Sequence, residues 1–228
     1  MKRKDIAQGL IELANQELST RTAIHEAGHA AAIHLGNKKK QLPPVFFQIV
    51  LKEGAQQEQS LTLPSNCDNG PARVDGGRLI HTLPPSMAEN DHFYPAQKQA
   101  FERAFDADII NLLVGPLAEA MYVAKRDGEL INPYLINLNA LHNYGGASDL
   151  TLVNEYLECL LISREQREKK IAGLFMAAYK FVSIWSHWRA IIGLANYILI
   201  SRKPVIECEE AMAVLDKHLY DKSIVITL

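Results

Sequence analysis

The chain is predicted to be mainly helical with a small β-sheet, an α+β fold class, on three observations. Apolar residues recur at close to a 3.6-residue spacing over most of the chain, beginning with residues 4–18. Runs rich in β-branched and aromatic residues are confined to two short segments, 45–51 and 76–83. No internal repeat and no low-complexity linker divides the sequence, so one domain is predicted over residues 1–228. Its predicted parts are a lead-in helix, a central region and a tail, at residues 1–18, 19–219 and 220–228.

Two helices are predicted to open the chain. The lead-in helix is amphipathic, with its apolar positions on one face. Ser19-Thr20 supplies good N-caps, so a second helix is predicted from there to about Leu35, where Gly36-Asn37 is a suitable stop. Gly28 lies inside this second helix and costs about 1 kcal/mol relative to Ala, which indicates a packing reason for its presence.

Two strands are predicted next, at Val45–Leu51 and at Gly76–Leu83, the second bounded by Pro84-Pro85. The polar stretch between them is rich in turn residues and contains a third candidate strand, Leu61–Leu63. An edge strand of such a sheet is able to pair with an extended peptide, as a protease groove requires. A sheet that only covers the core fits the same residues equally well.

The second half of the chain is predicted to be helical. Gly115-Pro116 is expected to separate the first two helices, because proline interrupts a helix and is favoured at the start of one. Residues 132–146 are expected to form a connecting segment, and Ser148-Asp149 is expected to open the next helix. The predicted helical segments are 95–112, 116–125, 148–160, 163–202 and 205–219.

Composition excludes several classes of protein. A formal net charge of −2 with 22% charged residues gives no basic field for nucleic acid or anionic lipid. The 3 cysteines, Cys67, Cys159 and Cys208, are widely spaced without a C-x-x-C pair, which favours free thiols in a reducing compartment. The apolar stretch Ile171–Ile200 is interrupted by charged residues, and no uncharged run reaches the roughly 18–20 residues of a membrane span. The expectation is a cytoplasmic protein without a membrane span or a nucleic-acid partner.

The segment Thr22–Ala32 carries the strongest chemical signal, His-Glu-x-x-His within a run of helix formers. Residues four apart lie on one face of a helix, so His25 and His29 can bind a single metal ion. Glu26 directly follows the first of them, the position from which a carboxylate reaches a metal-bound water. The alternative is a helix whose two histidines are satisfied by neighbouring groups. We interpret the motif as a zinc site of hydrolytic type.

A catalytic zinc usually has three protein ligands and one open position for water. A third histidine is missing from the motif helix, because Leu35 stands where the longer zinc motif has one and His34 turns off the ligand face. The acidic candidates are Glu102 with Asp106, Glu119 and Asp149. An aspartate at a helix start also has a capping role, so spacing alone does not choose among them.

Three motifs together resemble the peptidase domain of FtsH, the AAA+ membrane protease. They are Thr22–Ala30, Gly115–Glu119 in place of Gly-Gly-Arg-x-Ala-Glu, and Gly145–Leu150, which is similar to Gly-Ala-x-x-Asp-Leu. Looser similarity at Arg78–Pro84 and Trp185–Leu215 extends the resemblance over about Ser19 to Leu219. The sequence contains no Gly-x-x-x-x-Gly-Lys-Ser/Thr phosphate loop, so an unfolding ATPase is expected only as a separate partner.

The resemblance implies a helical zincin domain in which His25, His29 and Asp149 bind zinc and Glu26 is the catalytic base. It also implies that Glu119 lies behind a ligand and accepts a hydrogen bond from its imidazole, with Glu119 as the alternative ligand.

The expected activity is that of a stand-alone zinc endopeptidase acting on peptides or unfolded protein chains, with Glu26 as general base. One alternative is a non-catalytic binding or regulatory module that contains zinc. Another is a peptidase subunit that needs a separate ATPase. His81 and His142 are candidate donors to the oxyanion, and each is also explained as a structural or surface residue. The sequence does not specify an oligomeric state.

Overall fold

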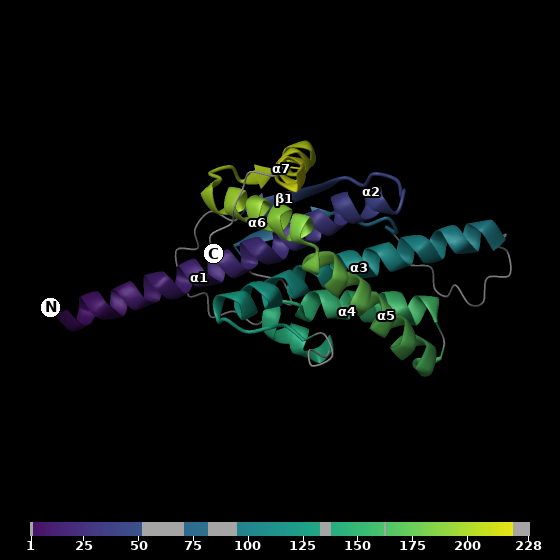
Figure 1. Cartoon of the computed structure of the whole chain (residues 1–228), viewed down its shortest axis with the longest axis horizontal. Coiled ribbons are helices and arrows are strands. Elements are labelled where there is room, and N and C mark those ends of the chain that lie inside the picture. Colours follow the sequence, from purple (N-terminus) through teal and green to yellow (C-terminus); the bar gives the residue numbers. More distant parts are fainter. Residues whose placement is uncertain (1, 52–70, 82–94, 133–137, 162, 221–228) are drawn as a thin grey trace, which may run out of the picture.

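The computed structural model describes residues 2–51, 71–81, 95–132, 138–161 and 163–220. Two long helices dominate it, and the other elements pack around them (Figure 1). The elements are α1 (Lys2–Ala31), a π-helical turn (Ala32–Gly36), α2 (Asn37–Lys39), β1 (Phe47–Leu51), β2 (Ala72–Gly76), α3 (Pro95–Arg126), a 3-10 helix (Leu138–Tyr144), α4 (Ala147–Leu160), α5 (Arg164–Ser183), α6 (Trp185–Ile200), β3 (Val205–Ile206) and α7 (Cys208–Tyr220). The predicted fold class, mainly helical with a small sheet, is confirmed.

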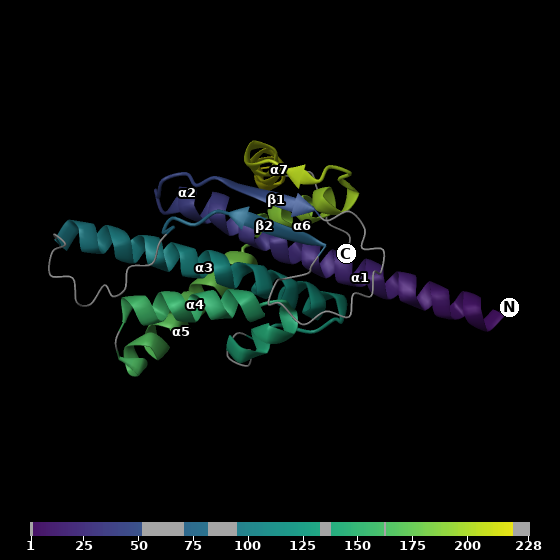
Figure 2. The same cartoon turned by 180° about the vertical axis from the view of Figure 1, so that it is seen from behind.

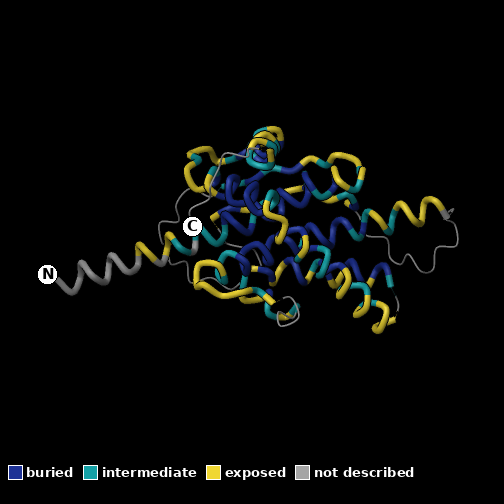
Figure 3. The backbone as a smooth tube through the Cα atoms, viewed as in Figure 1, coloured by how far each residue is buried: buried dark blue, intermediate teal, exposed yellow. Residues whose placement is uncertain are grey.

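The helices lie on two sides of the α1–α3 pair. In the views of Figures 1 and 2, α6, α7 and the sheet lie on the side of α1, whereas α4 and α5 lie on the side of α3. Figure 3 shows that burial is concentrated where the two long helices pass through the body, and that the N-terminal part of α3 is exposed. The centre of the core is therefore formed by the C-terminal part of α1, from Ala23 to Ala31, and the middle of α3, from Phe105 to Met121.

The sheet is antiparallel, with strand order β2-β1-β3. Its register pairs Phe47 with Gly76 and Ile49 with Val74, and Ile49 also faces Ile206. Phe47 and Ile49 are fully buried, because alternate side chains of a strand point to the same face. β2 is an edge strand of this sheet, so its outer side has no strand partner among the described strands.

The predicted boundary between the first two helices is wrong, because α1 continues through it. The Ser19 and Thr20 hydroxyls do not cap a helix but donate to the carbonyls of Asn15 and Gln16, each at 2.9 Å. Such bonds to the preceding turn leave the helical backbone unbroken. The predicted stop at Gly36-Asn37 is also wrong, since both residues are helical and the chain leaves the helix after Lys39.

The predicted break at Gly115-Pro116 is wrong as well, because α3 runs through both residues. Proline has no N–H to donate to the carbonyl of Leu112, four residues earlier. Burial compensates for this loss, since Leu113, Leu117 and Ala118 are at most 1% exposed on the neighbouring turns. The tertiary contact, rather than local preference, decides the structure of this segment.

The second predicted strand lies earlier in the chain than expected, at Ala72–Gly76 rather than at 76–83. Gly76 and Gly77 have φ of +86° and +80°, a conformation that ends the strand. The loop that follows is attached to α3, because Asp108 accepts hydrogen bonds from the backbone N–H groups of Leu79 and Ile80 at 2.9 Å. These loop residues therefore bond to a carboxylate instead of a neighbouring strand.

Three other boundaries differ from the prediction. The region 163–202 contains two helices, because Ile184 has extended backbone between α5 and α6. The last helix begins at Cys208, since the two preceding apolar residues form β3. The expected connection at 132–146 contains the 3-10 helix, and α4 starts where the sequence predicted a helix. The candidate strand Leu61–Leu63 and the tail beyond Tyr220 lie outside the described residues.

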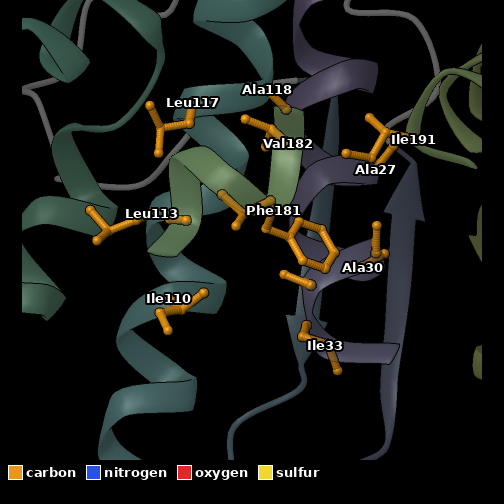
Figure 4. Close-up of a cluster of buried hydrophobic side chains, with 14 of the residues drawn as sticks. Ala27, Ala30, Ile33, Ile110, Leu113, Leu117, Ala118, Phe181, Val182 and Ile191 are labelled. Atoms are coloured by element: carbon orange, nitrogen blue, oxygen red, sulfur yellow. The ribbon is translucent and has the colours of Figure 1, made fainter. Parts of the chain in front are cut away.

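The helices α1 and α3 approach each other closely at Gly28. A Cβ atom on Gly28 would lie 2.9 Å from Ala118 Cβ and 3.1 Å from Gly115 Cα. Figure 4 shows Ala118 of this contact, together with the small side chains Ala27 and Ala30 of α1, among larger ones. The larger side chains labelled there are Ile33, Ile110, Leu113, Leu117, Phe181, Val182 and Ile191. The packing reason predicted for Gly28 is thus the close contact of the two central helices.

By length and composition alone, the segment Ala96–Arg126 of α3 would be able to cross a membrane. In the structure, 72% of its apolar window is buried against the rest of the chain, as in the core helix of a globular fold.

Replacing Gly28 with alanine tests the helix contact. The added methyl group has to push α1 and α3 apart, so we expect Gly28→Ala to lower the free energy of unfolding by about 1–3 kcal/mol. Urea unfolding followed by circular dichroism measures this change. Gly173 is the matched control, because it is exposed within α5 and a methyl group added there would meet no neighbouring atom within 4 Å. Gly173→Ala is expected to raise stability by about 0.5–1 kcal/mol, and equal gains in both variants would contradict the close contact.

Candidate metal centre

The structure brings three potential metal ligands together inside the fold. His25 and His29 lie on successive turns of α1, and Asp149 lies in the first turn of α4. One ligand atom from each residue lies within 4.8 Å of the others. The three residues are 6%, 9% and 8% exposed, so the group is buried.

The two histidines face the same carboxylate. His25 Nε2 lies 3.2 Å from Asp149 Oδ2, and His29 Nε2 lies 3.4 Å from Asp149 Oδ1. The imidazole planes are tilted by 69° with their centroids 4.8 Å apart. Two nitrogens and two carboxylate oxygens therefore converge on one small volume, as the ligand set of a metal ion does.

The other nitrogen of each imidazole has a hydrogen-bond acceptor. His25 Nδ1 lies 3.1 Å from Glu119 Oε2 and 3.2 Å from the carbonyl oxygen of Tyr144. His29 Nδ1 lies 2.8 Å from the carbonyl oxygen of Asn111. Because these oxygens only accept, both Nδ1 atoms donate, which leaves both Nε2 atoms available to an ion. This donor set and its supporting contacts fit a divalent metal, and zinc is one ion that such ligands take.

The electrostatics of the group also favour a cation. Burial lowers the pKa values of His25 and His29, but the bonds and charges of Asp149, together with the bond from Glu119 to His25, outweigh it and raise both. Burial raises the pKa of Asp149, yet the two neighbouring imidazoles hold it well below its ordinary value. Protons and a divalent ion would therefore compete for the same imidazole nitrogens beside Asp149.

Glu26 lies on a different side of α1 from the two histidines, because consecutive helix positions are rotated by about 100°. Its carboxylate accepts a hydrogen bond of 2.6 Å from the backbone N–H of Val74 in the edge strand β2. Glu26 and the three potential ligands all line one open cleft of about 480 Å³. Other residues that line it come from the strand, the following loop and the helices, and include Ile33, His81, Leu112 and Leu152.

Two glycines make room for the histidines. A Cβ atom on Gly115 would lie 2.3 Å from His29 Nε2, so the imidazole of His29 occupies the space that any side chain would need. Gly145 has φ of +69°, and a Cβ atom there would lie 3.1 Å from His25 Nδ1. Gly115, predicted as part of a helix break, thus leaves the space that the His29 imidazole occupies.

The other candidates lie apart from this group. Asp106 pairs with Lys170 at 2.6 Å, so the Glu102 and Asp106 pair is not joined to the histidines. His34 pairs with Asp216 at 3.0 Å, and His142 is exposed. His81 lines the cleft, while remaining exposed at its surface.

Two contributors to the site were missed in the sequence. The carbonyl of Asn111 orients His29, and a backbone group leaves no sequence signal. Arg21 forms an ion pair with Glu119 at 2.7 Å. Its position, four residues before His25 on the same helix face, is a signal that could have identified it.

Comparison of the chain with protein-family models, with curated proteins and with solved structures found no match. The family resemblance of the sequence motifs therefore stays a prediction.

The metal-free protein should lose stability as the pH rises. Folded-state pKa values of His25 and His29 above 6.5 give a contribution that is complete below pH 6.5 and is lost as the pH rises through the raised values. The lowered pKa of Asp149 gives a contribution that is present above about pH 4 and is lost at lower pH. In the presence of a chelator, we expect the melting temperature to fall as the pH rises above about 6.5.

The Asp149→Asn variant is the control for this measurement, because it removes the charge that raises both histidine pKa values. Its melting temperature should depend less on pH over the same range. A wild-type melting temperature that rises over this range, relative to Asp149→Asn, would contradict the assigned charge state.

Metal analysis of purified variants identifies the ligands. We expect about one zinc per chain in the wild type and a loss of more than roughly 100-fold in affinity for Asp149→Ala, since changes behind the ligands alone cost about 10- to 100-fold. Glu119→Ala should fall within that smaller range. Asp106→Ala, which removes a carboxylate paired with Lys170, should bind zinc like the wild type. Zinc lost mainly in Glu119→Ala would instead make Glu119 the third ligand.

Proposed function

We propose that this chain is a zinc-dependent metalloendopeptidase of the FtsH-like kind. The observation that carries the proposal is the position of Glu26, which lies on the wall of an open cleft together with the buried His25, His29 and Asp149 group. A ligand group alone would suit a structural metal. A carboxylate next to it in an accessible cleft supplies what hydrolysis also needs, a base for the attacking water.

A zinc ion bound at this group would supply a water of lowered pKa and would polarise the scissile carbonyl. His25, His29 and Asp149 would hold the ion, with the imidazoles oriented by Glu119 and by the Asn111 carbonyl. Glu26 would take the proton of the attacking water and deliver it to the leaving amine nitrogen. The hydrogen bond from Val74 already holds the Glu26 carboxylate at the cleft.

The edge strand β2 supports a peptide as the substrate. Its outer side has no strand partner among the described strands, and the N–H of Val74 on that strand contacts Glu26. An extended peptide that adds to β2 would lie next to both the base and the ligand group. We therefore propose peptides and unfolded chains as substrates, since an edge strand accepts an extended backbone and not a folded domain.

The two alternative functions require different roles of the residues in the cleft. A non-catalytic zinc module has no need of a carboxylate at position 26, whereas Glu26 lines the cleft. A peptidase that depends on a separate ATPase would use the same cleft, and would differ only in its need for that partner to degrade folded substrates.

Replacing Glu26 with glutamine tests the mechanism. The amide cannot accept the proton of the attacking water, so we expect Glu26→Gln to retain zinc while losing about 10²- to 10⁴-fold in kcat/KM. The measurement is cleavage of a fluorogenic peptide mixture and of an unfolded protein by the zinc-loaded enzyme, with metal content determined on the same samples. Glu155→Gln is a matched control, because Glu155 is exposed on α4.

A zinc-loaded Glu26→Gln protein with full activity would contradict this role of Glu26. A zinc-loaded wild type that cleaves none of these substrates would favour the non-catalytic module. Cleavage that appears only after an ATPase and ATP are added would favour the dependent subunit.

A further inference from the structure

Arg21 connects three of the elements that form the metal centre. It lies on α1 one turn before His25, and its side chain is 30% exposed. Its Nε donates to Glu119 Oε1 at 2.8 Å on α3, and its Nη2 donates to the carbonyl oxygen of Asn143 at 3.1 Å. Asn143 belongs to the 3-10 helix that precedes α4.

Through its contact with Glu119, Arg21 is linked to His25, the first of the three potential ligands. Arg21 binds Oε1 of this buried carboxylate, while the second oxygen, Oε2, accepts from His25 Nδ1. A carboxylate held at both oxygens has one orientation, and this orientation sets the rotation of the His25 imidazole.

Through its contact with the Asn143 carbonyl, Arg21 is linked by the backbone to Asp149, the third potential ligand. The next carbonyl, that of Tyr144, accepts from His25 Nδ1 at 3.2 Å. The chain then turns at Gly145, with φ of +69°, and enters α4, where Asp149 lies in the first turn. Arg21 therefore holds the start of the segment that carries Asp149 against the helix that carries His25.

We propose that Arg21 is a positioning residue of the metal centre, which aligns His25 through Glu119 and Asp149 through the Asn143 backbone. The inference rests on the metal site of the proposed function and not on peptidase activity. A guanidinium is suited to this role, because its planar donors reach a carboxylate and a carbonyl in two directions at once, whereas a lysine ammonium is a point charge. An ordinary surface ion pair would contribute little to stability and nothing to metal binding.

The test is zinc affinity, measured by competition with a chromogenic chelator on the folded, metal-free protein. Arg21→Gln removes both contacts and is expected to weaken zinc binding about 10- to 100-fold. Arg21→Lys should recover part of this loss, because it restores the charge near Glu119 without the second contact. Arg164→Gln is the matched control, since Arg164 pairs with Glu168 on the surface of α5. The visible spectrum of the cobalt-loaded protein should change in Arg21→Gln and stay unchanged in Arg164→Gln.

A double-mutant cycle separates positioning from general stabilisation. If Arg21 acts on His25 through Glu119, adding Arg21→Gln to Glu119→Gln should weaken zinc binding by less than it does in the wild type, because only the loss of the Asn143 contact then adds to the effect. Zinc affinity within twofold of the wild type in a folded Arg21→Gln protein would overturn the proposal, and so would independent, multiplying losses in the cycle. A wild type that binds no zinc would overturn the proposed function as well, which distinguishes the two failures.

Discussion

The close contact between α1 and α3 is the constraint on which the rest of the structure depends. At Gly28 a side chain would meet Ala118, and at Gly115 a side chain would overlap the imidazole of His29. The same approach places His29 Nδ1 2.8 Å from the carbonyl of Asn111 on α3. The packing of the core and the orientation of a potential metal ligand thus follow from one pair of glycines, and a change that separates the helices should affect both.

Charge compensation is the second requirement, because the site buries several ionisable groups. An isolated buried carboxylate is costly, and its cost falls when hydrogen-bonding partners of opposite charge surround it. Asp149 lies between His25 and His29, and Glu119 lies between His25 and Arg21. Positive and negative groups therefore alternate from the surface at Arg21 to the centre of the group. A divalent ion fits the inner end of this series, since it supplies positive charge between the imidazoles and Asp149.

The local sequence pattern was enough to predict part of the fold and part of the site. The helical period places His25 and His29 on one face, so this pair could be identified from four-residue spacing alone. The approach of Asp149, which lies 124 residues from His25, depends on tertiary packing, so spacing did not choose it and only the resemblance of the motif Gly145–Leu150 pointed to it. The segment Gly115-Pro116 was misjudged for the related reason that burial outweighs the local preference of proline. Boundaries such as Ile184 depend likewise on tertiary contacts.

The small sheet supplies one wall of the cleft that the helices line on the other sides. α1, α3 and α4 supply the ligand group and its supporting contacts, but these alone would leave Glu26 on an open helix face. β2 lies along that face, and the backbone N–H of Val74 donates a hydrogen bond of 2.6 Å to the carboxylate of Glu26. The strand is held in turn by its pairing with β1 and by the loop that Asp108 binds through Leu79. A cleft wall formed by an edge strand, next to the Glu26 carboxylate and a buried group of potential metal ligands, is the arrangement on which the proposed peptide site depends.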